Sequence, residues 1–269
     1  MSPGEARGIK YVLMDIDDTL TRNGKLPDVS YSALWRLNEA GLKVIPVTGR
    51  PAGWCDLIAR EWPVHGVIGE NGALAFWEEA QLNSGTTLSG NARLPVLKTD
   101  FHPEAVRNSH PVLERIKTRA LAEFPDLRSA KDQFARLYDI AIDFAEEDPV
   151  LPLETAQRVK AIAEEEGAYA KVSSIHVNIW MGKYDKLSMA ERFLQNRFGW
   201  QKGAGDHEVT FVGDSPNDEP MFARFPLACA VANITRYKSL VKNFPAYVSQ
   251  KECGEGFAEI ASEILAKRG

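Results

Sequence analysis

A short apolar run near the start of the chain ends directly in a cluster of acidic residues. The run, Ile9 to Met14, has the length and the β-branched and aromatic content of a buried strand. Asp15, Asp17 and Asp18 follow it at once. In open α/β sheets, ligands bind outside the carboxyl ends of the strands, so these carboxylates are expected in a binding crevice.

The alternation of a strand with a helix recurs along the chain. Asn71-Gly72 predicts a hairpin turn that leads into a returning strand at residues 73–77. Further strands are predicted at residues 42–47, 66–68, 209–212 and 227–231, and helices at 30–40, 51–62, near 218, and at 187–198, 236–243 and 256–267. This order predicts parallel βαβ units, and hence an α/β fold with a sheet covered on both faces.

The middle of the chain departs from this order. Residues 81–91 are rich in Asn, Ser, Thr and Gly and are expected to form a loop. Helices are then predicted at 111–124 and 153–166, and strands at 137–144 and 173–181. We therefore expect a core formed by residues 1–82 and 184–269, with a smaller α+β unit inserted at residues 83–183.

Composition narrows the classes of partner and compartment. The 269 residues are 44% hydrophobic and 26% charged, which is typical of a globular protein, and the net charge of −5 disfavours binding to nucleic acid. No apolar segment predicts a signal peptide or a membrane span, so a cytoplasmic protein is expected. Cys55, Cys229 and Cys253 are far apart and are expected to be free thiols. The oligomeric state is left open.

Polar groups at the ends of other strands support a binding crevice beside the first acidic cluster. Asp15 to Asp18 would repel one another without a cation, and Mg²⁺ prefers such oxygen ligands. Thr48-Gly49 follows the second strand, and Lys186 begins a later helix. Residues 213–218, Gly-Asp-Ser-Pro-Asn-Asp, follow a further strand. Each piece alone has an ordinary interpretation as a turn or a solvated lysine, but two acidic strand ends in one parallel sheet would converge on one crevice.

Taken in order, these motifs resemble the haloacid dehalogenase superfamily. Residues 15–21 match its first motif, Thr48 its second, Lys186 its third and residues 213–218 its fourth. The position of the insertion resembles the type IIB cap, and residues 70–73, 230–233 and 254–257 also resemble that group. The group includes Cof-type sugar phosphatases, sucrose-phosphate phosphatases, mannosyl-3-phosphoglycerate phosphatases and phosphomannomutases. The resemblance implies a Rossmann-like three-layer core with a parallel sheet and an α+β cap.

The resemblance also implies a role for each motif residue. Asp15 would be the nucleophile that forms an aspartyl-phosphate, and Asp17 the general acid and base. Mg²⁺ would be held by Asp15, the backbone carbonyl of Asp17 and Asp214, with Asp218 holding metal-bound water or orienting the motif lysine. The residues expected to bind the phosphoryl group are Thr48, Gly49, Lys186 and Asn217.

Substrate choice is expected to lie in the cap. In residues 173–181, apolar residues alternate with a polar set that includes His176 and Asn178. That polar face would either contact the substrate or form an exposed sheet face. Asn178 stands where phosphomannomutases and sucrose phosphatases carry an acidic residue, so their substrates are not transferred. Asn71 would touch the ligand or only shape the hairpin, and Arg136 and Lys183 are weaker phosphate-binding candidates.

The function expected from the resemblance is a Mg²⁺-dependent phosphatase acting on a small phosphorylated metabolite, with a sugar phosphate as the leading candidate. A phosphomutase, which returns the phosphate to the sugar, is the first alternative. A non-catalytic module that binds a phosphorylated ligand is the second, although such a module would not need Asp17 beside a nucleophile.

Overall fold

A computed structural model of the chain describes residues 1–79 and 95–269. The loop predicted at residues 81–91 and the predicted boundary between residues 82 and 83 lie outside the described residues. The strands are β1 Tyr11–Met14, β2 Lys43–Pro46, β3 Val67–Gly69, β4 Leu74–Glu79, β5 Val96–Phe101, β6 Arg128–Ser129, β7 Asp139–Asp143, β8 Tyr169–Val172, β9 His176–Trp180, β10 Val209–Gly213, β11 Cys229–Ala230 and β12 Tyr247–Val248. The α-helices are α1 Pro3–Gly8, α2 Asp28–Glu39, α3 Ala52–Glu61, α4 Pro111–Glu123, α5 Leu153–Glu165, α6 Lys186–Phe198, α7 Glu219–Arg224 and α8 Cys253–Arg268.

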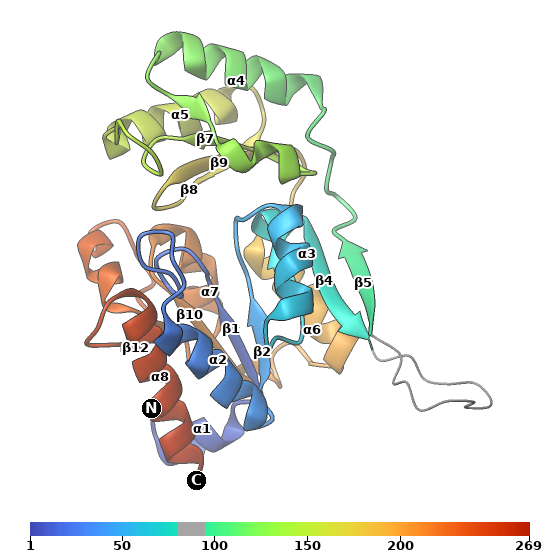
Figure 1. Ribbon diagram of the computed structural model, residues 1–269, viewed down its shortest axis with the longest axis vertical. Helices are drawn as coiled ribbons and strands as arrows, with labels where there is room; N and C mark the ends of the chain where they lie inside the picture. Colours follow the sequence, from blue (N-terminus) through green and yellow to red (C-terminus); the bar gives the residue numbers. More distant parts are fainter. Residues whose placement is uncertain (80–94) are drawn as a thin grey trace, which may run out of the picture.

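The core is a parallel sheet with helices on both faces (Figure 1). Its strands run in the order β12-β11-β10-β1-β2, and every neighbouring pair is parallel. Val12 and Met14 of β1 pack with residues of α2, α3 and α8, whereas Leu13 packs with residues of α6 and α7. A strand buried on both faces needs a continuous apolar sequence, which explains the run before Asp15. The predicted three-layer α/β fold is confirmed.

A small antiparallel sheet, β3-β4-β5, extends the core beyond β2. A parallel bridge from Val47 to Ile68 attaches it. The 3₁₀ helix Glu70–Gly72 joins β3 to β4, and Asn71 lies there in the left-handed region with φ 55°. Asparagine tolerates this conformation better than most residues, so the Asn-Gly pair correctly predicted a hairpin.

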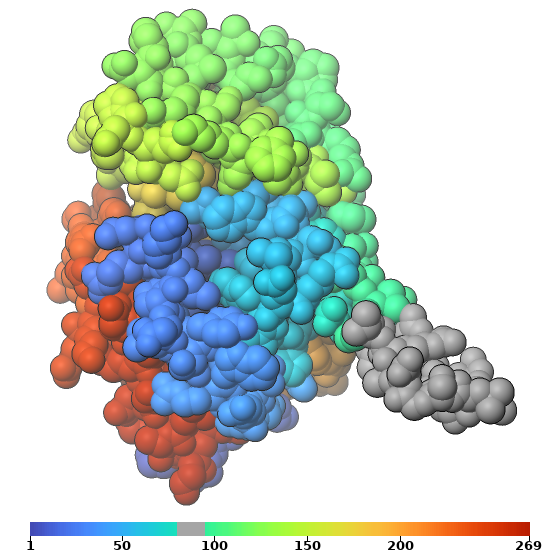
Figure 2. Space-filling view, viewed as in Figure 1, coloured from blue at the N-terminus to red at the C-terminus, as the bar shows by residue number. Residues whose placement is uncertain are grey.

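A four-stranded antiparallel sheet, β6-β7-β9-β8, lies beyond the carboxyl ends of the core strands, and we call it the cap sheet. Its apolar face packs against α4 and α5 and includes Ile142, Val177 and Ile179. Its other face is turned toward the core. In Figure 2 the green and yellow atoms of this part of the chain rest on the blue atoms of the core. The exact division of the chain into domains stays a prediction.

The helix predicted at residues 236–243 is wrong. The chain instead forms a 3₁₀ helix over Ala232–Tyr237. The carboxylate of Glu219 accepts the N–H groups of Lys242 and Asn243, so this backbone is satisfied without a helix. Helix α1 and the strands β5, β6, β8 and β12 had not been predicted.

The remaining features concern the cysteines and the helices. All three cysteines are free and buried. None of the helices in the described ranges has the length and apolar character that crossing a membrane requires.

Candidate active site

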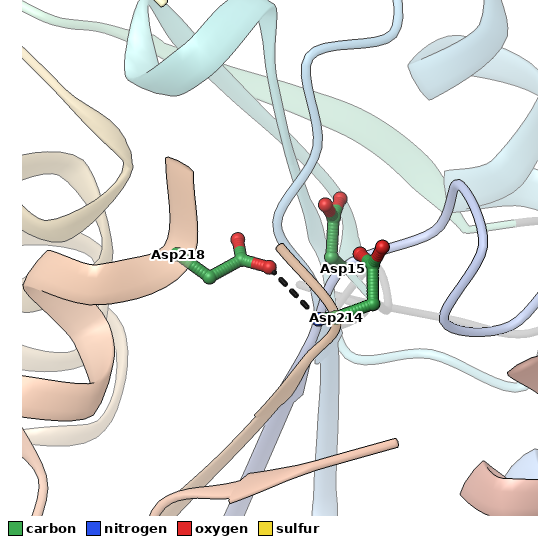
Figure 3. Close-up of side chains that lie close together, drawn as sticks. All are labelled: Asp15, Asp214 and Asp218. Carbon is green, nitrogen blue, oxygen red and sulfur yellow. Dashed lines mark hydrogen bonds between the residues drawn. The ribbon is translucent and has the colours of Figure 1, made fainter. Parts of the chain in front are cut away.

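Three buried aspartates meet at the carboxyl ends of β1 and β10 (Figure 3). Asp15 follows β1, Asp214 follows β10, and Asp218 comes from the turn after β10. One oxygen of each carboxylate lies within 4.8 Å of the others. β1 and β10 are parallel neighbours, with Met14 paired to Val212, so their ends bring the two acidic segments together. The convergence expected from the sequence is therefore present.

Lys186 holds two of these carboxylates from the start of α6. Its Nζ lies 2.9 Å from Oδ2 of Asp15 and 2.9 Å from Oδ1 of Asp218. The other oxygen of Asp218 accepts the backbone N–H of Asp214 at 3.1 Å. Both Asp218 oxygens are thus engaged within the protein; whether Asp218 orients Lys186 or holds metal-bound water stays a prediction.

The cluster carries an excess of negative charge. Burial raises the pKa of Asp15 to about 7; the charge of Lys186 opposes the rise, and repulsion from Asp218 adds to it. Burial also raises the pKa of Asp214 well above its usual range, followed by repulsion from Asp218 and Asp15. The pKa of Lys186 is raised, because the charges of Asp15 and Asp218 outweigh the effect of burial. A divalent cation would remove this repulsion, and an all-oxygen donor set suits Mg²⁺.

The space above the aspartates is a small central chamber between the core and the cap sheet. Its free volume is about 10 Å³, close to the space of one water molecule. Asp15, Asp17, Gly49, Arg50, Ser173, Ser174, His176, Asn178, Asp214, Ser215 and Asn217 line it. Thr48 is fully buried just below the chamber, where its hydroxyl accepts the N–H of Arg50 at 3.1 Å.

Arg50 joins the core to the cap side of the chamber, and sequence analysis missed this residue. Its guanidinium donates to both carboxylate oxygens of Asp17, with the shortest contact at 2.7 Å. It also lies 3.0 Å from Glu146 and 3.4 Å from Asp132. Its place directly after Thr48-Gly49 was the available signal, since that position follows a core strand at the crevice.

The cap face of the chamber is polar but buried. His176 and Asn178 are each 3% exposed, so they do not form the exposed sheet face that was one of the two expectations. His176 Nε2 lies 2.8 Å from Glu146, and Asn178 donates to Asp139 at 3.0 Å. Their role in specificity stays a prediction.

The other candidates are placed as follows. Asn71 is buried, and its Nδ2 has no hydrogen-bond partner among the described residues. It lies beside Gly49, where an added Cβ would be 3.2 Å from that nitrogen. Arg136 donates to the carbonyl of Gly49 at 2.9 Å and pairs with Asp139, so it is occupied within the protein. Lys183 is exposed and does not line the central chamber.

Glu70 is a second residue that sequence analysis missed. Its fully buried carboxylate accepts the N–H of Ala52 at the start of α3 and the N–H groups of Leu137, Tyr138 and Asp139. Burial raises the pKa of Glu70 to about 7; the charge of Asp139 adds to the rise, and the N–H donors oppose it. This one side chain connects α3 of the core to the beginning of β7.

The chain is similar to known proteins over most of its length. Residues 12–99 match the family of haloacid dehalogenase-like hydrolases. Phosphoglycolate phosphatase 1 of Saccharolobus solfataricus is 22% identical over 261 residues, which cover 96% of each chain. Among solved structures, protein 0175 of Thermoplasma acidophilum has a TM-score of 0.68 at 21% identity, covering 96% of this chain and 98% of that one. The sugar phosphatase BT4131, of subclass IIB, has a TM-score of 0.61 at 15% identity, covering 95% and 99%.

Proposed function

We propose that the chain is a phosphatase of the haloacid dehalogenase superfamily, which its similarity to that family and to a phosphoglycolate phosphatase supports, and that it releases phosphate from a small phosphorylated metabolite through an aspartyl-phosphate on Asp15. The observation that carries the proposal is the meeting of Asp15, Asp214 and Lys186 around one buried point. These residues come from two neighbouring strand ends and one helix start.

The contacts of Asp15 suit it to in-line attack on phosphorus. One carboxylate oxygen accepts the N–H of Ile16 at 2.8 Å, and the other faces Lys186 at 2.9 Å. These contacts fix the carboxylate in one orientation, which lowers the entropic cost of reaching the attacking geometry. Lys186 would then also offer its charge to the phosphoryl oxygens.

Asp17 would donate a proton to the leaving oxygen and later take one from water. Both of its carboxylate oxygens accept hydrogen bonds from Arg50 in the closed arrangement. Protonation of Asp17 would weaken this contact, because the protonated oxygen is a poorer acceptor and the guanidinium of Arg50 can only donate. Arg50 therefore controls the orientation in which Asp17 faces the chamber.

The cofactor of the proposed reaction is Mg²⁺. It would be held by Asp15, Asp214 and the backbone carbonyl of Asp17, and when bound it would neutralise negative charge on the transferring group. The substrate stays a proposal at the level of a small phosphate ester. One relative is named for phosphoglycolate and one for sugar phosphates, so a sugar phosphate and a phosphorylated hydroxy acid are both retained.

Hydrolysis of p-nitrophenyl phosphate by the purified chain tests the proposal. We expect turnover with Mg²⁺ and its loss on treatment with EDTA, restored by added Mg²⁺. A sugar monophosphate assayed in parallel separates the two kinds of enzyme, since a phosphatase releases inorganic phosphate and a mutase yields an isomer. Metal-independent turnover, or isomer formation without phosphate release, would contradict the proposal.

A further inference from the structure

We infer that the leaving group of the substrate carries a second anionic group, a carboxylate or a phosphate, which is bound by Lys171 and Lys160. The inference rests on the proposed function and specifies the substrate class of the same site. It is carried by the unequal charge of two grooves that lead out of the central chamber.

The position of Lys171 on the cap sheet turns it toward the core. Its neighbours Ala170 and Val172 belong to the apolar face that packs against α4 and α5. Successive residues of a strand point to opposite faces, so Lys171 lies on the polar face. It is paired in register with Asn178, which lines the central chamber.

The other charged groups on this polar face are already matched. Asp139 lies 3.0 Å from Arg136, Asp143 lies 3.2 Å from Arg128, and His176 lies 2.8 Å from Glu146. Lys171, in contrast, makes no salt bridge or side-chain hydrogen bond with any of residues 1–79 or 95–269. A partly buried lysine whose ammonium group has no partner, beside a binding chamber, is suited to an anionic ligand.

Two grooves continue outward from the central chamber. One, about 530 Å³ and called here the lysine groove, is lined by Lys160, Lys171, Ser173, Ser215 and Tyr237 among others. The carboxylate on its wall, Glu219, is engaged by the N–H groups of Lys242 and Asn243. Lys160 has only a long contact of 3.7 Å with Glu164. The lysine groove therefore presents net positive charge.

The second groove, about 490 Å³ and called here the acidic groove, leaves the chamber beside Asp17. Asp17, Asp18 and Glu146 line it, with Arg50 as the one cation on its wall among the described residues. Arg50 already pairs with Asp17 and Glu146. An anion would be repelled there and attracted to the lysine groove. The free volume of the chamber is only about 10 Å³, so we place the leaving group in one of the two grooves.

Lys171 has a possible second role, and the experiment must distinguish it from binding of the leaving group. On its other side, Lys171 borders a small space shared with Asn71, Lys186 and Asn217. From there it could act on the transferring phosphoryl group instead of the leaving group. An effect on the phosphoryl group would be the same for every substrate, whereas an effect on the leaving group depends on its charge.

The test is a ladder of phosphate esters assayed with the full-length chain and Mg²⁺. O-phosphorylated hydroxy acids of two to six carbons are compared with the diol monophosphate and the diol bisphosphate of the same length, and with p-nitrophenyl phosphate. For at least one length we expect kcat/KM to be about tenfold or more higher for an anionic member than for its neutral twin, the size of one charge-assisted hydrogen bond. The carboxylate and bisphosphate arms tell which anion is preferred.

The variant Lys171→Gln should bring this ratio close to one, and Lys160→Gln should lower it less. The neutral esters should keep their kcat/KM within about twofold, and Lys171→Arg should retain part of the preference. The control is Lys117→Gln, a cap lysine on α4 that lines neither groove. Inhibition of p-nitrophenyl phosphate hydrolysis by the free hydroxy acids, measured with the wild-type chain, gives a second readout that needs no variant.

The outcomes separate the inference from the proposed function. Hydrolysis of p-nitrophenyl phosphate with no charge preference along the ladder would overturn the inference alone. Equal losses in Lys171→Gln for charged and neutral esters would also overturn it, and would place Lys171 on the phosphoryl group. Failure to hydrolyse every ester, p-nitrophenyl phosphate included, would overturn the proposed function and the inference together.

Discussion

One acidic cluster lies at the carboxyl ends of the core strands and another lies on and beside the polar face of the cap sheet, and the two clusters are neutralised in different ways. On the core side, Lys186 pairs with Asp15 and Asp218, while the neighbouring Asp214 makes no salt bridge with any of residues 1–79 or 95–269. On the cap side the acidic residues are matched by arginines or a histidine, as the pairs Asp139–Arg136, Asp132–Arg136, Asp143–Arg128 and Glu146–His176 show. Both clusters are largely buried, so burial alone does not distinguish them.

The difference indicates where a metal ion belongs. A carboxylate whose charge is already balanced by an arginine gains little from a cation, whereas three carboxylates around one lysine gain much. The core cluster therefore has excess negative charge that Mg²⁺ would balance. The cap cluster is already neutralised by its paired network.

The largest expected effect is on the catalytic rate, which should depend on the core cluster far more than on the cap cluster. Asp15→Asn removes the proposed nucleophile and should lower kcat for p-nitrophenyl phosphate by about 10⁴-fold or more. Asp143→Asn makes the same charge change on the cap side and should keep most of the rate. Circular dichroism and steady-state kinetics on both variants check this. A folded Asp15→Asn variant with a near wild-type rate would refute the assignment.

The second expected effect is on the Mg²⁺ dependence of the rate, which should change on mutation of the core cluster but not of the cap cluster. Asp214→Asn removes a proposed ligand, so the Mg²⁺ concentration for half-maximal rate should rise by about 10- to 100-fold. In Asp143→Asn the Mg²⁺ titration should be unchanged. The measurement is initial rate against Mg²⁺ concentration. Equal shifts in the two variants would show that the core cluster does not bind Mg²⁺ in preference to the cap cluster.

The free energy of unfolding tests the ion-pair network through which Arg50 connects the core to the cap side. Arg50 is only 4% exposed as a side chain and pairs with Asp17 and Glu146. Arg50→Met leaves these carboxylates without their cation, so the free energy of unfolding should fall by about 3 kcal/mol. Arg60→Met breaks the pair with Asp56, in which both side chains are nearly half exposed, and should cost about 0.5 kcal/mol or less. Urea denaturation of both variants compares them, and similar losses would contradict a cooperative network around Arg50.

The smallest expected effect is a pH dependence on the cap side. The hydrogen bond from His176 lowers the pKa of Glu146 from 4.5 to about 2; burial opposes this shift, and the charges of His176 and Arg50 add to it. A carboxyl whose folded pKa is depressed contributes stability above its unfolded pKa, and this is lost as the pH falls from about 4.5 toward 2.

In the variant Glu146→Gln, the free energy of unfolding should fall less than in the wild-type chain as the pH is lowered from about 4.5 toward 2. The control Glu147→Gln alters the next carboxyl, which pairs with the exposed Lys131, and should keep the wild-type profile. Urea denaturation at several values of pH between 2 and 6 measures the difference. Parallel profiles for all three chains would show that the Glu146 contacts add no stability.

Sequence reasoning predicted the core well because its signals are local. A strand buried on both faces must be apolar throughout, so the run before Asp15 identified β1, and the parallel order brought Asp15 and Asp214 together. Helix α1 was missed although Ser2 and Glu5 form a capping box, a signal readable in the sequence. The contacts of Arg50 and Glu70 depend on residues more than 60 positions away, as the partners Leu137 and Glu146 show. No local pattern encodes such pairings.

The carboxylate of Glu70 has a consequence for how substrate enters. Pulling β7 away from α3 would leave this buried acid and its backbone donors without partners, at a cost of several hydrogen bonds. The turn from β8 to β9, in contrast, borders the two grooves. We therefore expect any opening of the cap sheet to keep the Glu70 contacts and to form its mouth on the side of Ser173 and Ser174.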